Sequence, residues 1–479
     1  MFDVLDRQVN LTGHQKKLAF IATWAVCLEF LDYFIIAFIL TFVSKPWSLS
    51  FGQSSMILLS SGIGAIFGAM YFGRLADRIG RRKVFLTTIA VFTLATSALV
   101  LTPDSVEVGW IYLTIVRVIV GFGAGGLYVV DLPLVQEFMP TAKRSKVTGY
   151  VTAAVPLGFL FGSLMVWLLS DAIGWRGILV VSVAMGLTVF FLRLSIPESP
   201  RYLLRQGDRT GARKSIAWAL EVDPETIPLG DLSIQGDQDK RSGISELFKF
   251  KRSFWVSTLS NLGIQTGYYG ITLWTPTLLI LVIGLTPSQS AFYMVFITLG
   301  ALAGRFGLSY LSELIGRRRT GTLAGLSAAG FLILTAILNQ AFVGELSVFF
   351  LLMIVVYFFA EGGFAVVGPY SAEVWPSSLR TTGMGFSYGI GGIGKVIGPL
   401  GLALILGSSN LVKPKATPTD LVPAFSYFAA WYVLCALMFL LFGFETKGKS
   451  LEALDREIES QRQGTERLEP RTPTPIGKS

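Results

Sequence analysis

The chain has 479 residues, of which 52% are hydrophobic and only 15% are charged, and its mean hydropathy is +0.60. Soluble globular domains carry about 25% charged residues, so this composition predicts a polytopic membrane protein. The net charge of +9 does not indicate nucleic-acid binding, because most of the 40 Lys and Arg residues lie in loops that we expect on one side of a membrane. Only Lys45, Arg176, Lys413 and Lys415 lie in the loops expected on the other side.

Apolar runs near the length of about 20 residues that a helix needs to cross a bilayer predict twelve spans. The first six lie at about 18–42, 52–74, 83–102, 109–134, 147–169 and 175–194. The second six lie at about 253–283, 288–312, 319–340, 346–372, 383–407 and 424–444. The predicted fold class is therefore all-α integral membrane, with two six-helix bundles.

The predicted bundles, 18–194 and 253–444, flank a basic and partly helical linker, 195–252. An N-terminal segment, 1–17, and a charged tail, 445–479, complete the chain. Twelve spans place both termini on one side, and the excess of Lys and Arg makes that side cytoplasmic. We expect a multi-pass protein of the plasma (inner) membrane, without a cleavable signal peptide.

Two motifs recur at one fixed interval. The motif GRLADRIGRR, which contains Gly80, has a counterpart ELIGRRR, which contains Gly316. The pattern E-x-x-P-x-x-x-R begins at Glu137 and again at Glu373, and this separation equals that from Gly80 to Gly316. We call this common separation the repeat interval. One interval shared by two motifs is typical of a duplicated half.

Two repeated sets of six spans around a basic linker resemble the major facilitator superfamily. The motifs above, with PESPR and ETKG closing the two halves, are similar to those of its sugar-porter and organic-ion branch. The pattern YYG followed by WTP in the seventh span looks like that of metabolite (aromatic or organic acid):proton symporters. The resemblance covers about residues 15–455 and implies a monomeric transporter that alternates access between two bundles.

Acidic and basic residues at the cytoplasmic ends of the spans are expected to form a gate. By resemblance, they make ion pairs across the two halves that hold the outward-open state and separate when the halves rock. The alternative is a solvated face that only sets topology. The expected gate residues are Asp77, Arg81, Glu137, Arg144, Glu313, Arg317, Glu373 and Arg380.

Ionisable groups within spans cost about 2.5–3.5 kcal/mol on insertion scales, so each is a candidate for function. Glu29 and Asp32 share one face of the first span. Proton-linked sugar porters set an acid of the first helix against an arginine of the fourth, where this chain has Arg117. We therefore expect Asp32 to pair with Arg117 and to carry the proton, with Glu29 as a second carrier. The alternative is a static pair that fixes helix packing.

Three more charges, Arg305, Glu361 and Lys395, lie in the C-terminal spans. Two cations that face one cavity favour an anionic substrate, and organic-anion transporters resemble this pattern. The alternative pairs these cations with Glu361 inside the bundle. Sugar-binding amides typical of sugar porters are mostly missing, whereas aromatic side chains supply faces for a planar ring. The other substrate-site candidates are Gln265, Tyr268, Tyr269, Trp274 and Tyr388.

The predicted function is proton-coupled uptake of a small organic anion, such as an aromatic or hydroxy carboxylate, by alternating access. The partners expected are that substrate, protons and the lipid bilayer. A sugar or polyol transporter, an efflux transporter and a non-transporting sensor are the alternatives. The single histidine, His14, precedes the first span, so neither catalysis by histidine nor a metal site is expected. No enzyme activity and no cofactor beyond the proton gradient are expected.

Overall fold

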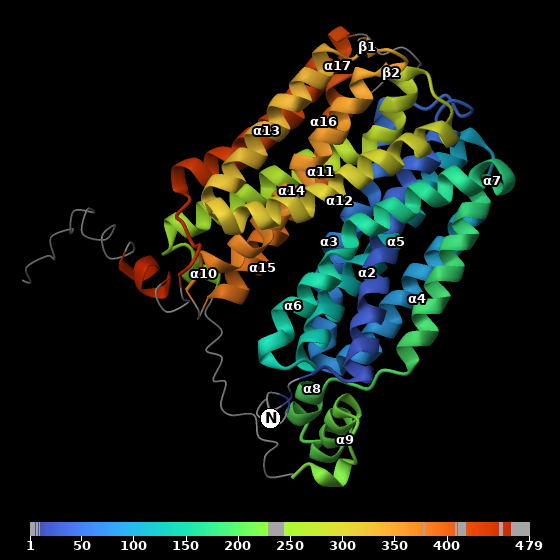
Figure 1. The fold of residues 1–479 in the computed structure, drawn as a ribbon. Helices are drawn as coiled ribbons and strands as arrows, with labels where there is room; N and C mark the ends of the chain where they lie inside the picture. Colours follow the sequence, from blue (N-terminus) through green and yellow to red (C-terminus); the bar gives the residue numbers. More distant parts are fainter. Residues whose placement is uncertain are drawn as a thin grey trace, which may run out of the picture.

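The computed structural model describes residues 5, 8, 10–228, 244–376, 379–407, 410, 418–449 and 454–460. Eleven helices in these residues are long and apolar enough to cross a membrane. One of them, α7 (Ala154–Leu194), contains two spans, because Gly174 interrupts its backbone at φ 65° and ψ 177° and the chain folds back (Figure 1). The predicted all-α fold of twelve spans is therefore confirmed.

The N-terminal half, blue to green in Figure 1, contains the first six spans. Its helices are α2 (Gly13–Val43), α3 (Phe51–Ile79), α4 (Arg81–Val100), α5 (Val106–Glu137), α6 (Thr141–Thr152) and α7. The linker then forms α8 (Pro200–Arg205), α9 (Arg209–Leu220), η1 (Pro224–Thr226) and α10 (Ile244–Leu247). The expectation of a partly helical linker is met in these described residues.

The C-terminal half, yellow to red in Figure 1, contains the other six spans. Its helices are α11 (Lys251–Ile283), α12 (Pro287–Ile315), α13 (Arg317–Ile337), α14 (Val348–Glu373), α15 (Arg380–Gly392), α16 (Gly394–Ile405), α17 (Pro418–Leu437) and η3 (Met438–Phe442). An unpredicted antiparallel hairpin, β1 (Phe342–Val343) with β2 (Leu346–Ser347), joins α13 to α14. Residues 454–460 of the tail are helical, and much of the tail lies outside the described residues.

Helix bounds recur at the repeat interval that the motifs define. Helix α3, the second helix of the N-terminal half, begins at Phe51 and has 29 residues. Helix α12, the second helix of the C-terminal half, begins at Pro287 and also has 29 residues. Ser50 and Thr286, again one repeat interval apart, both form a capping box with a glutamine three residues later. The internal duplication is thus visible in helix lengths and caps as well as in motifs.

The two halves contact each other at the end that lies away from the basic loops. The pairs α7–α12, α3–α16 and α2–α11 pack across the boundary, which we call the seam. At the start of α3, the Phe51 amide donates to the carbonyl of Asn410 at 2.9 Å, and its ring lies 5.8 Å from that of Trp274. In Figure 1 the bundles approach each other toward the hairpin and diverge toward α6 and α10. We call that second end, which carries GRLADRIGRR and ELIGRRR, the basic side.

Candidate functional site

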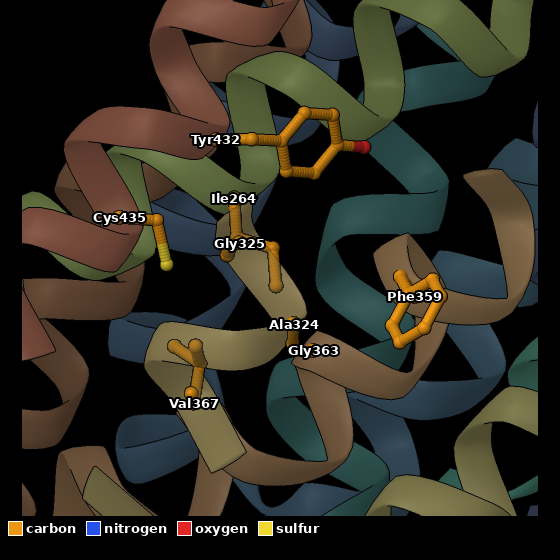
Figure 2. A pocket seen from close by; sticks show the side chains of 9 residues that line it. Ile264, Ala324, Gly325, Phe359, Gly363, Val367, Tyr432 and Cys435 are labelled. Carbon is orange, nitrogen blue, oxygen red and sulfur yellow. The ribbon is translucent and has the colours of Figure 1, made fainter. Parts of the chain in front are cut away.

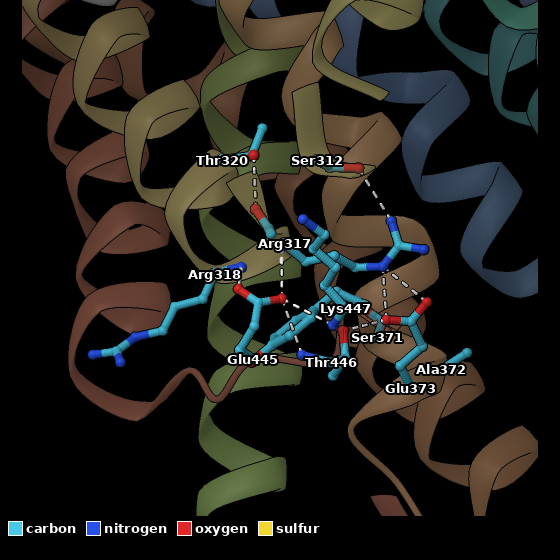
Figure 3. A network of polar contacts seen from close by, with 12 residues as sticks. Ser312, Arg317, Arg318, Thr320, Ser371, Ala372, Glu373, Glu445, Thr446 and Lys447 are labelled. Carbon is cyan, nitrogen blue, oxygen red and sulfur yellow. Dashed lines mark hydrogen bonds and ion pairs between the residues drawn. The ribbon is translucent and has the colours of Figure 1, made fainter. Parts of the chain in front are cut away.

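The basic side of the C-terminal half is organised around Glu445 and Glu373 (Figure 3). Glu445, from the ETKG block, accepts hydrogen bonds from the backbone amides of Arg317 at 2.9 Å and Arg318 at 3.3 Å. A carboxylate at a helix N-terminus is favoured by the helix dipole, so Glu445 stabilises the start of α13. The Arg317 guanidinium pairs with Glu373 at 2.7 Å, and Thr446 donates to the same carboxylate. The loop, two spans and the ETKG block are thereby tied together.

The N-terminal half has an equivalent cluster. Glu198, from PESPR, accepts from the amides of Arg81 at 2.9 Å and Arg82 at 3.0 Å. Arg81 and the Ser199 hydroxyl both bind Glu137. In this conformation each cluster lies within its own half, and the expected pairing across the two halves in the outward-open state stays a prediction.

The other predicted gate residues are less central. Arg144 donates to the carbonyl of Met139 at 3.3 Å. Arg380 donates to the carbonyl of Ala372 at 3.2 Å and pairs with Asp455 of the tail at 3.6 Å. Glu313 is exposed and joins neither cluster among the described residues. The side chain of Asp77 lies outside the described residues. A cavity of about 120 Å³ opens beside the N-terminal cluster, lined by Arg81, Pro133, Gln136, Glu137, Arg144 and Arg201.

Within the N-terminal bundle, Asp32 of α2 and Arg117 of α5 form the expected pair. The Arg117 guanidinium donates to Asp32 Oδ2 at 2.7 Å and to the Asp32 carbonyl at 3.3 Å. The side chains are 2% and 0% exposed. Both ions belong to one half, so the pair does not have to break when the halves move relative to each other.

A second buried pair in this half was not predicted from the sequence. Asp131 of α5 lies 3.0 Å from Arg193 of α7, and both side chains are buried. The Arg193 guanidinium also stacks over the ring of Phe85, 4.1 Å from its centroid. Arg193 lies at the end of the predicted sixth span, 175–194, beside the basic linker. The signal that identifies it is Asp131 itself, since a carboxylate within a span needs a partner.

Arg305 of α12 pairs with Glu361 of α14, with Glu361 accepting through Oε1. This is the arrangement that the alternative interpretation described. In this conformation Glu361 therefore occupies Arg305, and a role of Arg305 in holding a substrate carboxylate stays a prediction. Arg305 and Glu361 are separated by 56 residues, as are Arg81 and Glu137 and also Arg317 and Glu373. That spacing was a sequence signal for the pair.

Lys395, in the first turn of α16, lies at the seam instead of pairing with Glu361. Its Nζ is 4.9 Å from the ring centroid of Tyr269 in its own half and 5.4 Å from that of Tyr33 in the other. A Cβ added at Gly62 of α3 would lie 3.0 Å from Lys395 Cβ, so the glycine permits this close approach. Glu29 of α2 interacts electrostatically with Lys395, and its Oε2 has no hydrogen-bond donor among the described residues.

This arrangement is a cation between two aromatic faces, opposite an acid of the other half. Cation–π contacts hold an ammonium in place without neutralising it. Tyr33 was not predicted, because its position beside Asp32 gave no separate signal. The seam at Lys395 therefore combines one cation with two aromatic faces.

Other substrate-site candidates have structural partners. Trp274 is buried and donates to the carbonyl of Pro399 at 3.1 Å, which fixes α11 to α16. Gln265 donates to the Tyr388 carbonyl at 3.4 Å, and its Oε1 has no donor among the described residues. Tyr268 lies next to Glu361.

A small pocket between α11, α13, α14 and α17 is not a substrate site (Figure 2). Its cavity volume is about 10 Å³, which is the room that one water molecule needs. It is lined by Ile264, Gly321, Ala324, Gly325, Phe359, Gly363, Val367, Tyr432 and Cys435.

Comparison with known proteins gives relatives of nearly the same length. The Niacin transporter NiaP of Acinetobacter baylyi is 28% identical over 464 residues, which cover 94% of this chain and 99% of that protein. The Cis,cis-muconate transport protein of the same organism is 24% identical over 413 residues, covering 85% and 91% of the two chains. The inward open conformation of the xylose transporter XylE from E. coli has a TM-score of 0.70 at 18% identity, covering 92% of this chain and 99% of that chain. At this identity, the likeness to XylE shows a shared fold only.

The family model described as "Sugar (and other) transporter" matches residues 18–458. The match spans both halves and the linker, so it includes the two clusters of the basic side and the charges within the spans. This chain is therefore a member of the sugar (and other) transporter family of the major facilitator superfamily, a multi-pass membrane transporter of small molecules and not an enzyme.

Proposed function

We propose that this transporter couples the inward movement of protons to the uptake of a small organic carboxylate, with an aromatic monocarboxylate as the preferred class. The relatives named for niacin and for cis,cis-muconate support this proposal. Niacin is an aromatic monocarboxylate, and cis,cis-muconate carries two carboxylates on a planar conjugated chain, so it supports the broader class of organic carboxylates. Sugar transport is the alternative. It is less well supported, since the amides that bind sugars in sugar porters are mostly missing.

The observation that carries the proposal is Lys395 at the seam, between the rings of Tyr33 and Tyr269. Its ammonium supplies a charge-assisted hydrogen bond to a carboxylate, and the rings supply faces for a planar substrate. A neutral sugar has no need of this charge. We propose Lys395 as the residue that binds the carboxylate, in place of Arg305.

Proton coupling follows from where the opposite charges lie. Glu29 belongs to one half and Lys395 to the other, so alternating access changes their interaction. When the substrate carboxylate binds Lys395, Glu29 loses its counter-ion in a place where an unpaired charge is costly. A proton on Glu29 removes that cost. We therefore propose Glu29 as the acid that links the proton to the substrate, with Asp32 and Arg117 beside it as the fixed charges of the N-terminal bundle.

The basic side is proposed to be the cytoplasmic side of the plasma (inner) membrane, with both termini there, since positively charged loops stay inside. The contacts at the opposite end of the seam then favour an inward-facing conformation. We propose that the two basic-side clusters hold the helix ends in the geometry that lets the two halves meet when the transporter closes on the basic side. The transporter is proposed to act as a monomer.

The test is uptake into proteoliposomes under an imposed pH gradient. Nicotinate, its amide nicotinamide and xylose are compared in the wild type, in Lys395→Gln and in Lys83→Gln, a control at an exposed basic-side lysine. We expect the wild type to accumulate nicotinate only. Lys395→Gln is expected to raise the KM for nicotinate roughly tenfold or more, because a hydrogen bond to a charged group contributes about 1.5–3 kcal/mol. Accumulation of xylose, or of the amide as well as the acid, contradicts the proposal.

A further inference from the structure

Glu361 has an unused carboxylate oxygen deep in the C-terminal bundle. The residue is 1% exposed, and Arg305 occupies Oε1. Oε2 is buried and has no hydrogen-bond donor among the described residues. A buried carboxylate oxygen without a donor is costly and calls for a water, an ion or a proton.

Two tyrosine hydroxyls beside Glu361 are in the same situation. Tyr268 of α11 and Tyr432 of α17 both interact with Glu361, yet neither hydroxyl closes a hydrogen bond of normal geometry in the described part of the chain. Tyr357, one turn before Glu361 on α14, also interacts with it and donates instead to Thr275 at 2.9 Å. Glu361 Oε2 and the hydroxyls of Tyr268 and Tyr432 are therefore three buried polar atoms, on three helices, without a hydrogen bond of normal geometry among the described residues.

Glu361 is reached from the surface of the bundle through its partner, Arg305. The Arg305 side chain is 17% exposed, so the ion pair reaches the surface of the bundle on the Arg305 side. Protons thereby have an approach to Glu361 through Arg305 and its hydration.

The internal repeat relates this place to the acid–arginine pair of the other half. Tyr268 follows Asp32 by one repeat interval, so it occupies the position of Asp32 in the second half. In the N-terminal half the acid comes from the first helix and the arginine from the fourth. In the C-terminal half the acid comes from the fourth helix, α14, and the arginine from the second, α12. The C-terminal half thus has a buried acid–arginine pair of its own, built from different helices than the Asp32–Arg117 pair.

We propose that Glu361 is a second proton-binding site, so that two protons enter with each carboxylate. This inference rests on the proposed function. The proton adds to Oε2. The hydroxyls of Tyr268 and Tyr432 can then accept a hydrogen bond from the neutral acid or donate one to its oxygens. Neutralising Glu361 releases Arg305 from its ion pair. The charged and titratable groups that face Glu361 are Arg305, Tyr268, Tyr269, Tyr357 and Tyr432.

The test measures equilibrium accumulation of labelled nicotinate in proteoliposomes, with a pH gradient of one unit and the membrane potential clamped at zero. Each coupled proton multiplies the accumulation ratio tenfold under these conditions. We expect about hundredfold accumulation in the wild type and about tenfold in Glu361→Gln/Arg305→Gln, which removes both charges and keeps the pair balanced. Equal ratios in the two proteins overturn the second site. If the wild type shows no accumulation driven by the gradient, the proposed function itself fails. That result is distinguishable from equal accumulation ratios in the two proteins.

A milder variant keeps the test decisive if the double variant does not assemble. Tyr268→Phe/Tyr432→Phe removes the two hydroxyls and leaves the ion pair intact. We expect it to shift the pH dependence of nicotinate uptake, whereas Tyr370→Phe, whose hydroxyl binds the Phe444 carbonyl at 2.9 Å on the basic side, leaves it unchanged. An unchanged pH profile in the first variant overturns the proposal.

Discussion

The two halves of this transporter are alike at the basic side and different within the membrane. In each half an arginine side chain binds one glutamate and its backbone amide donates to another. These residues are Arg81, Glu137 and Glu198 in one half and Arg317, Glu373 and Glu445 in the other. Within the membrane-spanning region, the two halves differ. Glu361 stands one repeat interval after Gly125, where an added Cβ would overlap the Ala65 carbonyl oxygen. One half uses that position for close helix packing and the other for a charge.

This difference separates the machinery of movement from the chemistry of coupling. We propose that a cluster present in both halves serves the movement of one half relative to the other. A charge present in only one half serves a task that has one place, such as binding a carboxylate or a proton. Glu29, Glu361 and Lys395, which we propose to bind the protons and the carboxylate, belong to this second group. The difference between the halves is testable in four ways, the largest expected effect first.

Removing one ion of the Asp32–Arg117 pair is expected to be the most damaging change. Asp32→Asn leaves a fully buried arginine without a counter-ion, which costs about 3–5 kcal/mol. Arg305→Gln is expected to cost less, because Arg305 is partly exposed and Glu361 can take up a proton. Thermal unfolding in detergent measures both, and Asp32→Asn/Arg117→Gln serves as the charge-balanced control. Equal loss of stability in the two single variants would contradict this ranking of the pairs.

Glu29→Gln is expected to remove one coupled proton with little effect on stability. The acid has no hydrogen-bond donor at Oε2 among the described residues, so an amide replaces it at small cost. Accumulation driven by one pH unit is expected to fall roughly tenfold per lost proton, while exchange of labelled for unlabelled substrate continues. Glu225→Gln, at the exposed partner of Arg213, is the control. Full accumulation by Glu29→Gln would remove Glu29 from the mechanism.

Glu137→Gln and Glu373→Gln are expected to act alike. Each removes charge-assisted hydrogen bonds of about 1.5–3 kcal/mol that shape the basic-side end of one half for closure. Spin labels at Ile79 and Ile315, the matching last residues of α3 and α12, report the distance between the halves. Both variants should shift the distribution toward longer distances by a similar factor. A shift in only one of them means that the two clusters are not equivalent.

Gly80→Ala and Gly316→Ala are expected to give the smallest effects, again a matched pair. Both glycines have a positive φ, 102° and 97°, and an added Cβ would overlap the carboxylates of Glu198 and Glu445 respectively. Strain of this kind costs about 1–3 kcal/mol. Gly330→Ala, in a helix with open space around it, is expected to stabilise by about 0.5–1 kcal/mol. The melting temperatures of the three variants check this order.

The sequence was sufficient for the spans and for the repeat, because both depend on runs and intervals along one chain. It also predicted the Asp32–Arg117 pair by resemblance. It did not reveal which partner each remaining ion takes, since the faces that helices turn toward each other depend on packing. Thus the sequence did not reveal that Arg193 pairs with Asp131, and it left open whether Arg305 pairs with Glu361 or binds substrate. The roles of Glu198 and Glu445 as caps of α4 and α13 were missed because their partners are backbone amides 117 and 128 residues away.

The central claim is that a carboxylate and a proton enter together at the seam. Its most direct test is the external pH of a weakly buffered suspension of proteoliposomes that contain the wild-type protein and no imposed gradient. Adding nicotinate is expected to raise the external pH as protons follow the anion inward, and adding nicotinamide is expected to leave it unchanged. Uptake of labelled nicotinate without any rise in pH would contradict the account.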